Sequence, residues 1–169
     1  MKKVAKFDIV SEKQFTADME EFIMTKGQIS EMYKNLKKPQ RATKDSAGYD
    51  FFAPFDFILQ PGQSIKVPTG IRVHITEGWF LGILPRSGLG FKYRAQLDNT
   101  LGVIDGDYYF ADNEGHIMIK ITNDSKIKSK TMTVKAGTGF AQGIFLEYGV
   151  TEDDDADGIR NGGFGSTTK

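Results

Sequence analysis

The sequence predicts an all-β domain, because of its turn signals, its glycine content and the spacing of its apolar runs. From Ala47 onward, apolar runs of a strand's length are separated by Pro61-Gly62, Pro68-Thr69-Gly70 and Glu77-Gly78, which favour turns. Glycine supplies 19 of the 169 residues and indicates many tight turns. Strands at such short intervals are typical of a sandwich or barrel rather than of βαβ units.

The first part of the chain predicts one strand followed by a helical segment. Apolar and polar residues alternate from Val4 to Val10, as in a strand. Between residues 16 and 36 apolar side chains recur at helical spacing, which predicts one broken helix or two short ones packed on the β body. The stripe comprises Phe15, Met19, Phe22, Ile23, Ile29, Met32, Tyr33 and Leu36. Pro39 ends the segment, because the residue before a proline disfavours helical geometry.

The remaining strands are predicted in order along the β body. They cover residues 49–53, 55–59, 64–67, 70–75, 79–84, 115–123, 130–134 and 141–148. Residues 1–150 are therefore predicted as one domain, with 16–36 as a helical insertion. Residues 151–169 lack a strand signal and are predicted as an acidic linker followed by a flexible C-terminal arm.

Composition excludes several classes of function. Lys plus Arg and Asp plus Glu each number 22, so no strongly basic face for duplex nucleic acid is expected. Cysteine is absent, which excludes disulfides and thiolate metal sites. His74 and His116 have no second candidate ligand nearby in the sequence, so each is expected to be a strand side chain. Residues 1–8 lack a signal peptide's apolar stretch and no apolar run spans a bilayer, so a cytoplasmic protein is expected.

Residues 97–109 are the stretch around which a pocket is expected, as a β-hairpin with a polar tip and apolar arms. Asn99 can donate and accept hydrogen bonds at a base edge, Asp105 can deprotonate a water, and Tyr108 offers a flat face to a ring. The alternative is an ordinary β-turn with solvated acids, since turns are rich in such residues.

Two glycine-rich stretches carry the chemistry of a phosphate site. Residues 85–90 follow a predicted strand and combine a guanidinium, a hydroxyl and exposed backbone N–H groups. Residues 160–169 repeat this composition around a single aromatic residue, Phe164. The alternatives are a glycine-rich strand end without a ligand and a disordered terminus. Residues 153–158 match half of an EF-hand loop, but Phe164 stands where the bidentate Glu belongs, so a solvated linker is expected.

Five stretches in order resemble the five motifs of the trimeric dUTP pyrophosphatases (dUTPases), of the phage or Gram-positive bacterial type. The stretches are residues 47–50, 85–89, 99–108, 135–142 and 162–167. The resemblance spans residues 41–168, and five motifs in the same order are highly specific. It implies a jelly-roll-like dUTPase fold with a short helical N-terminal segment. It also implies a homotrimer whose active sites combine three chains, with one chain's C-terminal arm closing a site made by the other two.

The resemblance implies an activity and a role for each matching residue. The activity is Mg²⁺-assisted hydrolysis of dUTP to dUMP and pyrophosphate, which keeps uracil out of DNA and supplies dUMP for dTMP synthesis. Asp105 would activate water for attack on the α-phosphorus, and Asp50 would steady a metal-bound water. The nucleoside would meet Asn99, Val103, Ile104, Met118 and, at the sugar, Tyr108. Phosphate oxygens would meet Arg86, Ser87, Gly88 and Gln142. The arm would contribute Arg160, Phe164, Gly165, Ser166 and Thr167, with Phe164 stacked on uracil and Arg160, Ser166 and Thr167 at the γ-phosphate.

Four departures from the family pattern stand out. Gly139 occupies a position where the fourth motif usually carries Arg, and Arg160 lies one residue closer to the aromatic of the fifth motif than is usual. Residues 110–114 resemble an insertion beside the site. Residues 16–36 lie outside the common core and offer a surface for a regulatory protein partner.

Two other functions compete with dUTP hydrolysis. A dCTP deaminase of the same fold needs a Glu at the base, whereas the third-motif stretch offers Asp105 and Asp107. A nucleotide-sensing regulatory binding module would use the same body without turnover, but the intact Asp105 argues against lost catalysis.

Overall fold

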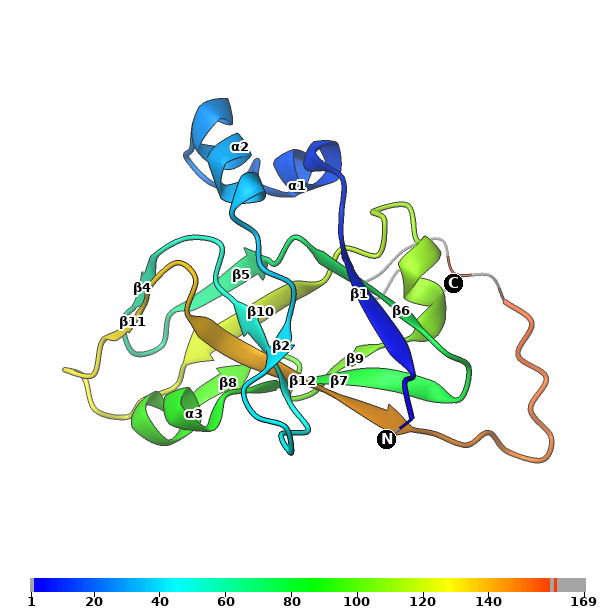
Figure 1. Cartoon of the computed structure of the whole chain (residues 1–169). Helices are drawn as coiled ribbons and strands as arrows, with labels where there is room; N and C mark the ends of the chain where they lie inside the picture. Colours follow the sequence, from blue (N-terminus) through cyan, green and yellow to red (C-terminus); the bar gives the residue numbers. More distant parts are fainter. Residues whose placement is uncertain (1, 159, 161–169) are drawn as a thin grey trace.

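The computed structural model describes residues 2–158 and 160, in which antiparallel strands dominate (Figure 1). The strands of this part of the chain are β1 (Ala5–Ile9), β2 (Gln40–Arg41), β3 (Tyr49–Phe52), β4 (Phe57–Leu59), β5 (Ser64–Pro68), β6 (Ile71–Ile75), β7 (Trp79–Pro85), β8 (Ala95–Leu97), β9 (Gly102–Ile104), β10 (Met118–Asn123), β11 (Met132–Val134) and β12 (Gly139–Glu147). The helices are α1 (Glu12–Asp18), α2 (Lys26–Lys34), α3 (Ser87–Tyr93) and a 3₁₀ turn, η1 (Gly106–Phe110).

Two larger sheets form the body of the molecule. One has the strand order β2-β3-β12-β7-β9 and the other the order β5-β10-β8, while β1 pairs with β6 and β4 with β11. Their inner faces share one core, to which the first sheet contributes Phe51, Leu81 and Phe140 and the second Ile119 and Ile121, all buried. The all-β class predicted from the turn signals is confirmed.

The N-terminal segment forms two short helices that lie side by side at one end of the β body (Figure 1). Helix α1 begins at Glu12, four residues before the predicted start, and the side chain of Ser11 caps it. Thr25 and Gln28 form a capping box on α2. Phe15 and Met19 of the predicted stripe are fully buried. The expected packing of Ile23 is wrong, because this residue lies in the break between the helices and is fully exposed.

The helices are short throughout the region that the structure covers. The longest of those in residues 2–158, α2, has nine residues. None of them is long and apolar enough to cross a membrane.

The hairpin predicted at residues 97–109 is wrong in its pairing. Strand β8 pairs with β10, whereas β9 pairs with β7, so the turn between them leads from one sheet to the other. Thr100 in this turn has a φ of 65°, a left-handed conformation that is uncommon outside glycine. The two strands were predictable from their residues, but their partners depend on contacts distant in the sequence.

Candidate functional site

A cavity of about 630 Å³ opens where the two larger sheets meet. Strands β7 and β9 contribute from one sheet and β8 and β10 from the other, with the β8–β9 turn at the rim. Seven residues predicted for the site line this cavity: Asn99, Val103, Ile104, Asp105, Tyr108, Met118 and Arg160. The structure thus brings together the predicted nucleoside-binding residues and the predicted base.

Strand β9 forms one wall of the cavity as the edge strand of its sheet. Gly102 lies opposite Ile83 of β7, and a Cβ atom at Gly102 would lie 3.1 Å from the Ile83 Cβ, so glycine permits this close approach. An edge strand turns one row of its N–H and C=O groups away from its neighbour. These groups offer the alternating donors and acceptors that a base edge requires.

The ring of Tyr108 forms another wall, and its hydroxyl is held by the protein. The side chain is 5% exposed, and its hydroxyl donates to the His116 carbonyl at 2.8 Å and accepts from Asn113 Nδ2 at 2.8 Å. Burial raises the pKa of the Tyr108 phenol, so the hydroxyl stays protonated and can donate. The ring face is therefore the part of Tyr108 available to a ligand.

Two carboxylates and one guanidinium meet at the mouth of the cavity. Asp105 follows β9 directly and Asp107 lies in η1. Arg160 Nη2 lies 2.5 Å from Asp105 Oδ2, and Arg160 Nε lies 2.8 Å from Asp107 Oδ1. The sequence predicted a phosphate partner for Arg160, and in the structure its guanidinium pairs with two acids of its own chain.

The residues predicted to hold phosphate form a second cluster, beyond the end of β7. Arg86 Nε lies 3.0 Å from Asp50 Oδ1, and Arg86 Nη1 donates to the Gly139 carbonyl at 3.1 Å. Gln142 Nε2 donates to the Pro85 carbonyl at 3.1 Å. Ser87 and Gly88 are exposed in the first turn of α3. None of the five predicted residues, Asp50, Arg86, Ser87, Gly88 and Gln142, lines the cavity within the described part of the chain.

Two glycines allow the side chains of this cluster to pack on the backbone. A Cβ atom at Gly139 would lie 2.8 Å from Arg86 Nη1, and one at Gly48 would lie 2.5 Å from Gln142 Oε1. Glycine at 139 therefore leaves the space that the Arg86 guanidinium occupies. This packing is the physical reason for Gly139 in the fourth motif, where Arg is usual.

The remaining predicted residues, Phe164, Gly165, Ser166 and Thr167, lie outside the described residues. Across residues 2–158 and 160, no group of three or more His, Cys, Asp or Glu side chains is arranged to hold a metal ion. The sequence did not predict a role for Asp98, Lys120 or Asn113. Asp98 and Lys120 line the cavity and form an ion pair at 2.7 Å. The sequence placed Asp98 in the predicted hairpin, Lys120 in a predicted strand and Asn113 in the predicted insertion, and it gave no further signal for them.

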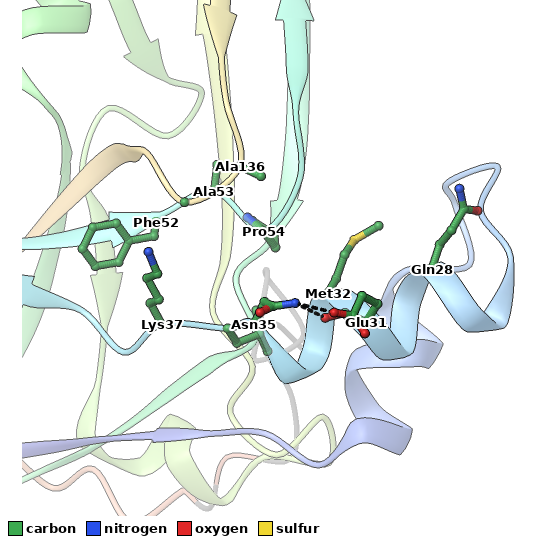
Figure 2. A pocket seen from close by; sticks show the side chains of 11 residues that line it. Gln28, Glu31, Met32, Asn35, Lys37, Phe52, Ala53, Pro54 and Ala136 are labelled. Atoms are coloured by element: carbon green, nitrogen blue, oxygen red, sulfur yellow. Dashed lines mark hydrogen bonds between the residues drawn. The ribbon is translucent and has the colours of Figure 1, made fainter.

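A second cavity of about 520 Å³ lies between α2 and the segment that follows β3 (Figure 2). Asn35 Nδ2 donates to Glu31 at 2.9 Å on its helical side, and Lys37 Nζ lies 5.9 Å from the Phe52 ring. None of the residues predicted for the site lines it.

Comparison with known proteins gives concordant results. A family model described as dUTPase matches residues 34–168. A deoxyuridine 5'-triphosphate nucleotidohydrolase of Lactococcus lactis is 36% identical over 140 residues, covering 80% of this chain and 91% of the relative. The corresponding protein of Escherichia coli O9:H4 is 37% identical over 140 residues, with 78% and 87% covered.

Solved structures are similar over most of this chain. The crystal structure of dUTPase from Streptococcus mutans is 28% identical, with a TM-score of 0.63, and covers 86% of this chain and 98% of that one. The dUTPase from phage phi11 of S. aureus is 19% identical, with a TM-score of 0.64 and 93% and 98% covered. At that lower identity the likeness concerns the fold.

Proposed function

The chain belongs to the dUTPase family, and from this membership we propose that it hydrolyses dUTP to dUMP and pyrophosphate. The observation that carries the proposal is the cavity in which Asn99, Asp105 and Tyr108 meet. A base-reading amide, a general base and an aromatic wall around one space are what this reaction requires.

Selection of the nucleoside is assigned to the walls of the cavity. Asn99 and the backbone of Val103 and Ile104 would pair with the uracil edge, with Met118 beside it. The amino group of cytosine would place a hydrogen-bond donor opposite a donor of the protein. The methyl group of thymine would need more space than the uracil position it replaces. The Tyr108 ring would lie against the sugar and exclude a ribose 2′-hydroxyl.

Asp105 is proposed to take a proton from the attacking water. The water oxygen bonds to the α-phosphorus, the bond from that phosphorus to the bridging oxygen breaks, and pyrophosphate leaves. Arg160 of the same chain is 2.5 Å from Asp105, so this guanidinium must first leave the carboxylate, and a triphosphate is the competing anion that would attract it. The substrate's own charge thus releases the base.

The separation of the two clusters supports a site shared among chains. Arg86, Ser87, Gly88 and Gln142 do not line the cavity of their own chain within the described residues. In a closed homotrimer each cavity can receive the phosphate cluster of a neighbour and the arm of a third chain, which carries Phe164, Gly165, Ser166 and Thr167. The homotrimer and a cytoplasmic location belong to this proposal.

We propose that Mg²⁺ is coordinated mainly by the phosphate oxygens of the substrate and by waters, and not by a cluster of protein side chains. The described residues hold no cluster of three metal-binding side chains, and Mg²⁺ prefers phosphate oxygens and waters. When bound, it would neutralise phosphate charge and make the α-phosphorus a better electrophile. Asp50, oriented by Arg86 at 3.0 Å, is the side chain proposed to hold one of its waters.

The proposal is tested by measuring pyrophosphate release with Mg²⁺ from dUTP, dCTP, dTTP and UTP in parallel, with ammonia assayed in the dCTP reaction. Release from dUTP alone is expected. Ammonia from dCTP would assign the protein to the deaminases. No product from any nucleotide would favour the binding-module alternative.

A further inference from the structure

The loop between η1 and β10 reaches back to the wall of the cavity. Asn113 in this loop donates from Nδ2 to the Tyr108 hydroxyl at 2.8 Å, and its Oδ1 accepts the Gly115 N–H at 3.2 Å. The Tyr108 hydroxyl in turn donates to the His116 carbonyl at 2.8 Å. Both partners of the hydroxyl therefore belong to one short loop, part of which the sequence marks as an insertion.

We propose that Asn113 is a positioning residue, which sets the discrimination between deoxyribose and ribose by fixing the ring of Tyr108. The inference rests on the proposed function, in which this ring lies against the sugar. Two hydrogen bonds at the far end of the side chain fix the tilt of the ring and its distance from the opposite wall. Without the Asn113 donor the ring can tilt, and space for a 2′-hydroxyl opens.

The backbone of the loop is built for this contact. Glu114 and Gly115 have φ values of 58° and 68°, so the chain turns back on itself directly after Asn113. A Cβ atom at Gly115 would lie 2.5 Å from the Tyr108 carbonyl oxygen, which shows how closely the loop packs on η1. Glycine at 115 thus brings Asn113 within reach of the hydroxyl.

Helix α1 and Gly70, the residue before β6, hold the loop from the other side. The Glu114 carboxylate accepts the Ser11 hydroxyl at 2.6 Å and the Ser11 N–H at 2.8 Å. His116 is fully buried; its Nε2 accepts the Gly70 N–H at 2.7 Å, and its Nδ1 lies 2.5 Å from Asp18 Oδ2. The loop is therefore fastened to α1 and to Gly70, the residue before β6, at positions one and three residues after Asn113.

The test compares kcat/KM for dUTP and UTP in the wild type and in Asn113→Asp. The aspartate keeps an acceptor for the Gly115 N–H but cannot donate to Tyr108, and its carboxylate competes with the His116 carbonyl for the hydroxyl proton. We expect the preference for dUTP to fall about fivefold, the effect of one hydrogen bond. Asp112→Asn is the matched control, because it changes charge in the same loop at an exposed side chain, and it should leave the preference unchanged.

A double-mutant cycle with Tyr108→Phe separates positioning from a general loss of stability. Tyr108→Phe keeps the ring and removes the hydroxyl, so it should reproduce the loss of preference, and adding Asn113→Asp should change it no further. An unchanged preference in a folded Asn113→Asp protein, or additive effects in the cycle, would overturn the assignment. If the wild type releases no pyrophosphate from dUTP, the proposed function itself fails, which is a different result.

Discussion

Replacing Asp105 with Asn is the sharpest test of the proposed chemistry. The amide has nearly the same shape but cannot accept a proton from water, and a general base contributes about 10²- to 10⁴-fold to a rate. We therefore expect kcat for pyrophosphate release to fall within that range. Binding of dUTP should change far less, because Asp105 is assigned to the attacking water and not to the nucleotide.

The expected change in binding follows from the ion pair with Arg160. The Asp105 side chain is 45% exposed and that of Arg160 21% exposed, and the two atoms lie 2.5 Å apart. Pairs this accessible to solvent contribute about 0–1 kcal/mol, so losing the pair changes the dissociation constant at most about fivefold. The change should be toward tighter binding, because one negative charge near the triphosphate is gone and Arg160 keeps only Asp107.

The assay pairs single-turnover pyrophosphate release with calorimetric binding of a non-hydrolysable dUTP analogue. Asp107→Asn is the matched control, since it removes the same charge and also loses a contact to Arg160, at 2.8 Å. It should retain kcat within about tenfold of the wild type, outside most of the range of a lost general base. Equal losses of kcat and binding in Asp105→Asn, or equal losses of kcat in the two variants, would refute the role of Asp105.

Three further predictions follow from contacts described above. Tyr108→Ala removes the wall assigned to the sugar, so UTP should become a substrate in the four-nucleotide assay; unchanged discrimination would count against that wall. Gly139→Ala places a Cβ 2.8 Å from Arg86 Nη1 and should displace the guanidinium, raising KM for dUTP about tenfold if a charge-assisted contact is lost. Initial rates decide this, and an unchanged KM would show that Arg86 does not hold phosphate. For Asp18, burial is the largest single effect and alone would raise the pKa, but the hydrogen bonds from His116 and Gln14 and the nearby charges of His116 and Lys66 together outweigh it and hold the pKa below its ordinary value. A lowered pKa stabilises the fold above the ordinary carboxyl range, near pH 4, and this stability is lost as the pH falls through the folded-state pKa. Asp18→Asn should therefore unfold at a lower urea concentration than the wild type at pH 7 and lose less stability on acidification. If the free energies of unfolding of the two proteins changed in parallel with pH, the reasoning would be contradicted.

Most strands were predictable because their residues alternate between turn signals, whereas some short helices were not. Helix α3 contains Gly88 and Gly90, which weigh against a helix in any local pattern. Its C-cap is Arg94, whose φ of 53° gives a left-handed conformation that glycine usually supplies. Helix α3 connects β7 of one sheet with β8 of the other, and no local signal predicts it.

The candidate site likewise has a part that the sequence predicted and a part that it did not. The residue types of Asn99, Asp105 and Tyr108 indicated a pocket, and these side chains do meet in one cavity. The partner of Arg160 was not predictable, because it depends on the path of the acidic segment after β12, which returns toward η1 (Figure 1). The protein partner suggested for the N-terminal helices stays a prediction.

The strands that flank the turn at residues 98–101 belong to different sheets, and this has a consequence for how a bound nucleotide would act on the whole molecule. A ligand bound between β9 and β10 would contact both sheets and link them, in addition to the side-chain packing between them. Any motion that slides one layer over the other would then require the ligand to leave. Amide hydrogen exchange should accordingly slow in both sheets together when a non-hydrolysable nucleotide is added, including at amides far from the cavity.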